Sequence, residues 1–301
     1  MALCILVACF TSDKFLCMCT SLINLKAFGD FVIACSAINR IHIREGLVLP
    51  KIVVGEHVRS LASALQLEES VHFIGDKSWK DVPAAFDVRK RGVYAAFKSI
   101  IEIRRSLKES SVEGQLIFDK LGWRERFIGR GFRLYELSEG HGNIYIAYDN
   151  LFKSLGFKLD FEYSSCACID KAIIIPGARM IHRVIPAGVI SRYVHELARR
   201  NIRSEVVVLE GEAVDLPVNI NLRVIPREFG ALIDAIKNSD LVISADSLPS
   251  HLSEFFHIPV FVSTPAPKPY WLPKSSYKTT GWATFSDINP FHCWLERNYS
   301  L

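Results

Sequence analysis

The chain has 301 residues, which is enough for two domains with sizeable cores, and it is 50% hydrophobic and 23% charged, as ordinary globular proteins are. Its net charge of +4 suits anionic substrates or an anionic membrane surface and is too weak to indicate a nucleic-acid partner. No apolar run reaches the ~18 residues that a transmembrane segment requires.

The cysteines and the first residues point away from a metal site and from a secretion signal. The eight cysteines show no paired metal-knuckle spacing, and the two C-x-C pairs, at 17–19 and 166–168, have no histidine nearby. We therefore expect free thiols in a reducing compartment and no bound metal. The box LVAC is lipoprotein-like, but no basic residue precedes it and its apolar stretch is too short for a signal peptide. We expect residues 1–17 to lie outside the folded core, and a start at Met18 stays an alternative.

The first half of the chain alternates strand-like and helix-like segments. Short apolar runs predict strands over residues 21–25, 52–54, 71–74 and 116–118. Apolar residues at helical spacing predict helices over residues 31–43, 58–67, 93–104 and 144–155. In the third of these helices, the residues grouped on one face are Val93, Phe97, Ile100 and Ile101. Strands that alternate with helices indicate a parallel sheet covered on both faces.

The turn after the first strand carries the first candidate site residue. Gly29 allows a tight turn or the close approach of a ligand. Asp30 is expected at the start of the next helix, facing the crevice at the carboxyl edge of the sheet. The alternative is that Asp30 only caps that helix, because aspartate is favoured at this position.

Residues 157–170 break the alternation, and we interpret them as the connection between two domains, 1–160 and 161–301. Strands are predicted next over residues 172–175, 206–209, 222–225, 241–244 and 259–262. Helices are predicted around residues 189–197, 229–236, 249–256 and 290–299. Four prolines keep residues 264–273 out of regular structure, and we expect this segment to rim the crevice. The second half is thus another alternating α/β domain.

The segment from Asp240 to Thr264 contains a second set of candidate residues. Asp246 and Ser247 follow a buried-type strand, and a helix is expected to begin directly after them. A helix start offers free N–H groups and the positive end of the helix dipole, which suit a phosphate. We expect Asp246, Ser247 and His251 to face that place together. The alternative is that the first two only cap the helix and that His251 is a polar residue of its first turn.

Four segments, in order, resemble glycosyltransferase family nine, the bacterial lipopolysaccharide heptosyltransferases. Leu25–Ala34 (LKAFGDFVIA) looks like the family's opening strand and G-D turn, and Leu116–Phe127 (LIFDKLGWRERF) looks like its mid-domain segment. Ile175–Pro186 (IPGARMIHRVIP) is similar to its P-G-[AS] element with the basic residue that follows. Asp246–Leu252 (DSLPSHL) is similar to its D-[ST]-G-x-x-H-L element. Each motif alone is weak, and the ordered set over residues 20 to 265 is more specific.

The resemblance implies an α/β fold of two Rossmann-like domains facing a cleft, the glycosyltransferase-B type, with the acceptor mainly in the first domain and the donor mainly in the second. It implies an inverting, metal-independent transfer of a heptose-like sugar from a nucleotide-diphosphate donor to a lipopolysaccharide-type glycolipid, with no cofactor. A bacterial, cytoplasmic protein at the periphery of the inner membrane fits this implied role.

The resemblance also implies a role for each candidate residue. Asp30 would be the catalytic base for the acceptor hydroxyl, and Arg183 would stabilise the leaving diphosphate. The donor would be bound by Gly177, Arg179, Asp246, Ser247 and His251. For Arg183, the alternative is a solvated surface arginine.

Two residues depart from the family pattern. Ile185 replaces the usual tryptophan, which should affect packing only, and Leu248 stands where the family has glycine. A side chain at Leu248 would crowd a backbone that approaches a pyrophosphate, or change the turn. Leu248 therefore favours the alternative function, a catalytically degenerate protein that binds a nucleotide sugar or a glycolipid. A Rossmann oxidoreductase is disfavoured because no G-x-G-x-x-G follows either first strand.

Overall fold

The computed structural model of the chain describes residues 20–41, 49–76, 79, 81–110, 112, 114–137, 140, 142–159 and 168–299. The expectations for residues 1–17, for the first C-x-C pair and for most of the connection 157–170 fall outside this part of the chain. Within it, no helix combines the length and the apolarity that crossing a membrane requires.

The chain divides into two compact units. The first combines the residues up to Gly140 with Ala147–Asp160, and the second combines His141–Ile146 with the residues from Phe161 onward. The helix α7 (Ile144–Ser154) therefore contributes its first turn to the second unit and the remainder to the first. The predicted first domain, residues 1–160, contains all of α7. The helical pattern of α7 gives no indication that its first turn belongs to the second unit.

The first unit is built on a parallel sheet with the strand order β3-β2-β1-β4-β5. Its strands are β1 (Thr20–Asn24), β2 (Lys51–Gly55), β3 (Val71–Ile74), β4 (Gln115–Phe118) and β5 (Arg133–Glu136). All residues of β1 and β4 are buried, as expected for central strands that are covered on both faces.

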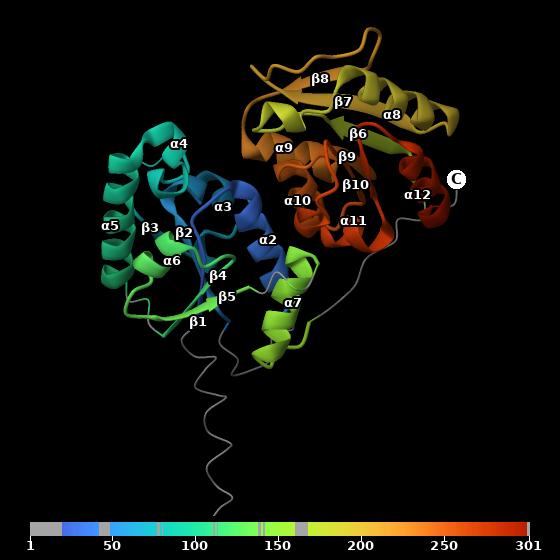
Figure 1. The fold of residues 1–301 in the computed structure, drawn as a ribbon. Helices are drawn as coiled ribbons and strands as arrows, with labels where there is room; N and C mark the ends of the chain where they lie inside the picture. The colour runs from blue at the N-terminus through green and yellow to red at the C-terminus, as the bar shows by residue number, and fades with distance from the viewer. Residues whose placement is uncertain are drawn as a thin grey trace, which may run out of the picture. The chain divides into compact units, whose positions relative to one another are not determined.

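The helices of the first unit cover both faces of this sheet. Besides α7 they are α2 (Phe28–Asn39), α3 (Arg59–Ala64), α4 (Val88–Arg91), α5 (Val93–Glu109) and α6 (Trp123–Ile128). The chain leads from β1 outward to β2 and β3 and then returns to β4 on the other side of β1. Right-handed crossovers then put α2 and α3 on one face and α5 and α6 on the other (Figure 1). Short 3-10 turns occur at η1 (Glu56–Val58), η2 (Glu68–Ser70) and η3 (Ala84–Phe86).

The long helix α5 buries one face and leaves apolar side chains on the other. Its buried residues are Ala96, Ser99, Ile100, Ile103 and Leu107. Val93, Phe97 and Ile101 are exposed. The sequence-based grouping of Ile100 with these three residues is therefore wrong, because the sheet selects the i, i+4, i+7, i+11 face that begins at Ala96.

The second unit has a parallel six-stranded sheet with the order β11-β10-β9-β6-β7-β8. Its strands are β6 (Lys171–Ile175), β7 (Arg203–Leu209), β8 (Leu222–Ile225), β9 (Leu241–Ala245), β10 (Val260–Thr264) and β11 (Trp282–Thr284). Its helices are α8 (Ala187–Arg199), α9 (Phe229–Lys237), α10 (Leu248–Phe255), α11 (Lys274–Thr279) and α12 (Asn289–Asn298), with 3-10 turns η5 (Ile181–Arg183) and η6 (Pro269–Trp271). The segment that the sequence predicted to be irregular, 264–273, begins with the last residue of β10, Thr264, and is otherwise interrupted by the η6 turn.

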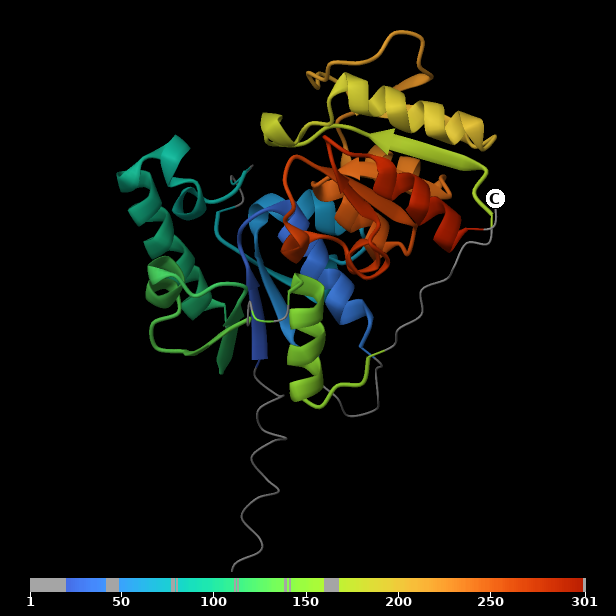
Figure 2. The same cartoon turned by 45° about the vertical axis from the view of Figure 1, so that its right-hand side comes forward.

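One face of the second sheet packs against α8 and α12. Tyr193 of α8 lies edge-on to Phe261 of β10 and to Phe291 of α12, with ring centroids 6.0 and 5.0 Å apart. Figure 2 shows α8 running along the edge of this unit beside β6. The same core holds Ile185, which is fully buried, so a smaller side chain than the expected tryptophan fills that place.

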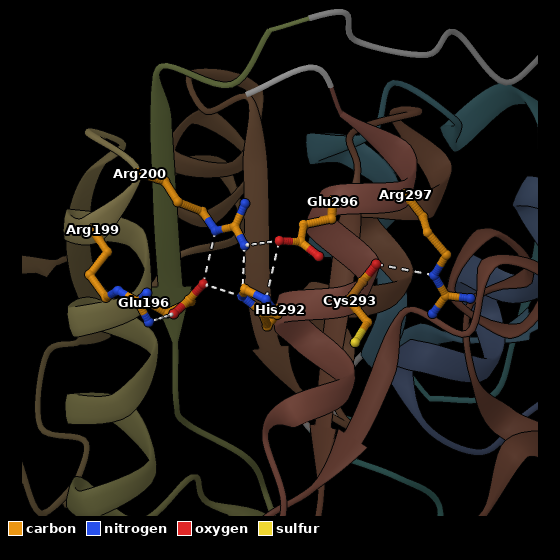
Figure 3. A network of polar contacts seen from close by, with 7 residues as sticks. All are labelled: Glu196, Arg199, Arg200, His292, Cys293, Glu296 and Arg297. Carbon is orange, nitrogen blue, oxygen red and sulfur yellow. Dashed lines mark hydrogen bonds and ion pairs between the residues drawn. The ribbon is translucent and has the colours of Figure 1, made fainter.

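A polar network holds α12 against α8 (Figure 3). Glu196 accepts a hydrogen bond from Arg200 Nε at 2.8 Å and lies 2.8 Å from His292 Nδ1, while His292 Nε2 lies 3.2 Å from Glu296. Burial acts to raise the pKa of Glu196, but hydrogen bonds from His292 and Arg200 hold that pKa below its ordinary value. Arg200 lies three residues before β7, so this network belongs to the amino edge of the sheet, and we assign it a structural role.

Candidate functional site

Each sheet has one place where its topology favours ligand binding. In a doubly wound sheet, ligands bind outside the carboxyl ends of two neighbouring strands whose connections run in opposite directions. These neighbours are β1 and β4 in the first unit, and β6 and β9 in the second. The predicted site residues lie in the loops and the first helical turns that follow β1, β6 and β9.

In the second unit, Arg183 and Asp246 join the loops after β6 and β9. Arg183 Nη1 lies 3.3 Å from Asp246 Oδ2 and also 3.3 Å from the Asp246 carbonyl oxygen. Asp246 is buried, and burial raises the pKa of its carboxyl group while Arg183 and Lys268 act to lower it. The Arg183 side chain stays 31% exposed, so one part of its guanidinium pairs with Asp246 while another part reaches solvent. Arg183 is thus not the freely solvated arginine of the alternative interpretation.

The start of α10 lies beside this pair and is not capped by a side chain. Ser247 is the N-cap residue, yet its hydroxyl donates to the Gly177 carbonyl oxygen at 3.2 Å instead of bonding to the helix. The interpretation that Ser247 only caps α10 is therefore wrong. The hydrogen bond ties the loop after β6 to the loop after β9. Pro249 has no N–H group and the Ser250 N–H donates to the Ser247 carbonyl oxygen at 3.2 Å, so the capacity of this helix start to bind an anion rests on the Leu248 N–H and the helix dipole.

His251 lies one turn into α10 and is buried. Its Nδ1 is 3.0 Å from the hydroxyl of Tyr145, a fully buried residue at the start of α7 that belongs to the same unit. Burial, with a smaller effect of Arg183, lowers the pKa of His251 to about 4. His251 is therefore neutral near pH 7 and acts as a hydrogen-bonding group, not as a cation. Sequence reasoning missed Tyr145, since its aromatic side chain fits the ordinary apolar stripe of α7.

Gly177 and Arg179 fit their expected roles less well. A Cβ atom at Gly177 would collide with the Glu212 carboxylate, so glycine here makes room for an acidic side chain. Glu212 also accepts a hydrogen bond from the Leu209 N–H at 3.2 Å. Arg179 is exposed on the loop after β6. Positive charge near Asp246 therefore comes from Arg183, with Lys268 also close enough to act on the Asp246 carboxyl.

Leu248 occupies the first helical position of α10 and is half-buried. It does not have a positive φ, so the backbone there does not need the conformational freedom of glycine. Leucine at this position therefore does not require a different turn from the one that glycine would form. The other expected effect, crowding of a bound pyrophosphate by the Leu248 side chain, can be tested by experiment.

In the first unit, Asp30 lies in the first turn of α2. The helix begins at Phe28, three residues before the predicted start, so Asp30 is its third residue and not its cap. Asp30 Oδ2 accepts a hydrogen bond from the Ala27 N–H at 3.2 Å, which anchors the start of the helix. Its side chain is half-buried at the carboxyl edge of β1. The structural contact of the alternative interpretation is thus present.

An ion-pair cluster next to Asp30 was not singled out from the sequence. Lys26, directly after β1, lies 2.8 Å from Asp119 after β4 and 3.7 Å from Glu125 of α6. The Lys26 carbonyl oxygen is 2.9 Å from His57 Nε2. A small pocket at this edge is lined by Lys26, Asp119 and Glu125 together with apolar side chains. The sequence does show polar residues after β1 and after β4. Their spacing along the chain, however, does not indicate that Lys26 pairs with Asp119.

Within the described residues, no group of three or more His, Cys, Asp and Glu side chains is arranged to hold a metal ion. The free cysteines among these residues are Cys35, which is buried, and Cys168 and Cys293, which are exposed.

The chain resembles known proteins in its three-dimensional structure. No protein-family model matches the chain, and no curated protein matches it either. The E. coli heptosyltransferase WaaC with ADP has a TM-score of 0.58 at 13% identity, covering 93% of this chain and 99% of that chain. The glycosyl transferase family 9 structure from Veillonella parvula has a TM-score of 0.56 at 14% identity, covering 88% and 86%. E. coli ADP-heptose lps heptosyltransferase II has a TM-score of 0.55 at 12% identity, covering 93% and 98%.

These likenesses concern the fold. The chain has two parallel-sheet, Rossmann-like α/β units and resembles glycosyltransferase structures, heptosyltransferases among them, over most of its length. The predicted α/β fold of glycosyltransferase-B type and the resemblance behind it are confirmed at this level.

Proposed function

We propose that this chain is a glycosyltransferase that moves a sugar from a nucleotide-diphosphate donor to a glycolipid, with inversion at the sugar carbon. The observation that carries the proposal is the Arg183–Asp246 pair beside the start of α10, where β6 and β9 end. A diphosphate leaving group needs positive partners, and an arginine together with a helix start supplies them. The likeness in fold to heptosyltransferases supports this reaction class.

The donor would bind in the second unit. The Leu248 N–H at the start of α10 and the exposed part of Arg183 would hold the diphosphate, and Asp246 and His251 would orient the sugar by hydrogen bonds. ADP-heptose is the donor we propose first, because the structures of E. coli WaaC are described as complexes with ADP and with ADP-2-deoxy-2-fluoro heptose. Gly177 would contribute through its carbonyl oxygen, which positions Ser247.

The acceptor would bind at the carboxyl edge of β1 and β4 in the first unit. The acceptor hydroxyl oxygen would form a bond to the anomeric carbon of the donor sugar, while the bond from that carbon to the diphosphate breaks. The electron pair goes to the diphosphate oxygen, and the hydroxyl proton goes to the Asp30 carboxylate. Arg183 and α10 would offset the charge that develops on the diphosphate. In this proposal the transfer needs no metal ion, and the acceptor is a lipopolysaccharide-type glycolipid at the cytoplasmic surface of the inner membrane.

The test of this function has two readouts. Titration calorimetry with ADP measures donor binding, and release of ADP from ADP-heptose in the presence of a heptose-free lipopolysaccharide acceptor measures transfer. We expect ADP to bind and transfer to proceed equally well with and without EDTA. Transfer that EDTA abolishes would overturn the metal-independent step, and an absence of ADP binding would overturn the choice of donor.

The second candidate is a protein that binds a nucleotide sugar or glycolipid without transferring the sugar. The observation that favours it is Leu248, whose half-buried side chain lies at the first position of α10, beside the proposed diphosphate site. This candidate predicts ADP binding without ADP release from ADP-heptose, so the same pair of measurements separates the two functions.

A further inference from the structure

The outer surface of α5 and α6 is apolar where a surface helix of a globular protein is ordinarily polar. Tyr94 is 86% exposed, Phe97 is 53% exposed and Trp123 is 67% exposed, and Ile101 and Phe127 are exposed beside them. We call these five residues the α5–α6 surface. Contiguous exposed apolar patches on proteins mark interaction sites.

The two helices form one surface and not two separate patches. The rings of Phe97 on α5 and Phe127 on α6 have centroids 6.4 Å apart. Arg104 of α5 lies over the Phe127 ring, 5.6 Å from its centroid, and donates to the Phe127 carbonyl oxygen at 2.9 Å. Trp123 lies four residues before Phe127, which is one helical turn along α6. Figure 1 shows α6 lying beside α5.

Basic residues share the exposed face of α5. Lys98, Arg105 and Lys108 follow Tyr94 at intervals of 4, 11 and 14 residues, which is the spacing of one helix face. All three are exposed. Residues 87–130 contain eleven Lys and Arg against six Asp and Glu, so this segment alone is more positive than the whole chain, whose net charge is +4. The charge favours an anionic partner.

The apolar part of this surface is oriented toward one edge of the sheet. The chain reaches the carboxyl edge at the end of β3 and returns through α5 to the start of β4, so Tyr94 and Phe97 lie in the half of α5 nearer the carboxyl edge. Trp123 begins α6 five residues after β4 ends at that same edge. This is also the edge that carries Asp30 and the Lys26–Asp119 pair.

We propose that the α5–α6 surface docks on an anionic lipid bilayer, with its aromatic side chains in the interface and its basic side chains on the lipid headgroups. Aromatic residues with basic neighbours are the combination that binds such an interface. The proposal rests on the proposed function in one respect: docking by this surface would bring the acceptor edge of the first unit close to a membrane-embedded glycolipid. Lipid binding itself requires neither donor nor acceptor.

The test is co-sedimentation of the full chain with phosphatidylglycerol-containing vesicles and with pure phosphatidylcholine vesicles. We expect binding to the anionic vesicles, weakened by salt because the headgroup attraction is screened. Combined Tyr94→Ser and Phe97→Ser should lower the partition constant at least ~10-fold. Combined Lys98→Gln, Arg105→Gln and Lys108→Gln should lower it on the order of 100-fold, since each basic residue adds to the attraction.

Matched controls lie in the second unit. Val218 and Val224 are also exposed apolar residues, 86% and 58% exposed, and their replacement by serine should leave vesicle binding unchanged. Exposed Arg203, Arg227 and Lys237 provide a charge control when replaced by glutamine. Equal losses in the controls and in the α5–α6 variants would overturn the proposal.

Two further readouts keep the proposal testable if a variant does not fold. Brominated lipids should quench the fluorescence of the otherwise unchanged chain, and Trp123→Phe should remove most of that quenching. Sedimentation velocity without lipid tests whether a second copy of the chain covers the α5–α6 surface instead of a bilayer. A dimer that dissociates when Tyr94→Ser and Phe97→Ser are introduced would overturn the proposal in favour of that second copy. ADP binding by calorimetry is unaffected by these substitutions, so a failure of docking is distinguishable from a failure of the proposed function.

Discussion

At the residue scale, Arg183 is the side chain to which the proposed function assigns the largest part in donor binding. Its guanidinium group pairs with Asp246 and is also partly exposed. Arg183 could therefore contact a ligand while the buried Asp246 carboxylate keeps its ion-pair partner. We predict that Arg183→Ala weakens ADP binding by roughly 10- to 100-fold, because a charge-assisted hydrogen bond contributes about 1.5–3 kcal/mol. Titration calorimetry measures this, with Arg203→Ala, at the amino end of β7, as the matched control. Unchanged affinity in Arg183→Ala would leave this arginine only a structural partner of Asp246.

His251 should make the stability of the second unit depend on pH. Its pKa in the folded state is about 4, below the ordinary 6.5, so the unfolded chain binds more protons between these values. The stabilising contribution is complete above pH 6.5 and decreases as pH falls toward 4. We predict that about 2 kcal/mol of the free energy of unfolding is lost between about pH 7 and about pH 5 through this residue.

Urea unfolding at the two pH values measures this effect when the chain is compared with His251→Gln. Other groups titrate in both proteins, so their contributions cancel in the difference. The variant should show a weaker dependence on pH than the unchanged chain. The same dependence in both would mean that burial does not hold His251 neutral in the folded chain.

Asp30 provides the residue-scale test of the reaction itself. We predict that Asp30→Asn abolishes sugar transfer and leaves the affinity for ADP nearly intact, because the carboxylate acts on the acceptor hydroxyl. The asparagine oxygen can still accept the hydrogen bond from the Ala27 N–H, so the start of α2 should be kept. Thermal melting of the variant checks this, and transfer by a well-folded Asp30→Asn protein would remove Asp30 from the mechanism.

At the scale of elements, the two proposed functions differ in what they imply for α10, because Leu248 favours the binding protein. Leu248 lies at its first position in ordinary helical conformation. We predict that Leu248→Gly lowers the free energy of unfolding by about 0.5–1 kcal/mol, because glycine loses more backbone freedom in a helix. We also predict that ADP affinity does not fall. A large gain in affinity, measured by calorimetry, would show that the leucine side chain crowds the site and would favour the binding protein.

The sequence predicted elements with a clear apolar run better than elements without one. The strands β3 and β8 lie at sheet edges, yet they were predicted with the bounds that the structure has, because each is a short apolar run. The edge strands β5 and β11 and the helices α6 and α11 were not predicted. β5 has two apolar residues between charged ones and β11 has only three residues, so neither gives a strand-like apolar run. The inner face of α5 was misjudged because both of its faces are apolar.

The candidate site was predictable only in part, for a physical reason. Position at the carboxyl end of a strand follows from the order of elements, so Asp246 and Ser247 could be placed beside a helix start. Contacts between loops depend on the order of strands in the sheet, which the sequence does not state. The Ser247 bond to Gly177 and the Lys26–Asp119 pair are contacts of this kind.

At the scale of the whole molecule, the fold is retained although the sequence has diverged. Identities of 12–14% accompany TM-scores of 0.55–0.58 over most of the chain, and no family model matches. A similar fold at such identities is physically reasonable, because many apolar side chains can fill the same core. Activity therefore has to be argued from the candidate residues, which are Asp30 in the first unit and Arg183, Asp246 and α10 in the second.

The central claim is sugar transfer from a nucleotide-diphosphate donor, and one measurement tests it most directly. ADP-heptose and a heptose-free lipopolysaccharide are incubated with the full chain, and the transferred heptose is detected on the glycolipid by mass spectrometry. The account predicts a mass increase of one heptose that the unchanged chain produces and Asp30→Asn does not. Glycolipid of unchanged mass, from a chain that binds ADP, would contradict the transferase and leave the nucleotide-sugar binding protein.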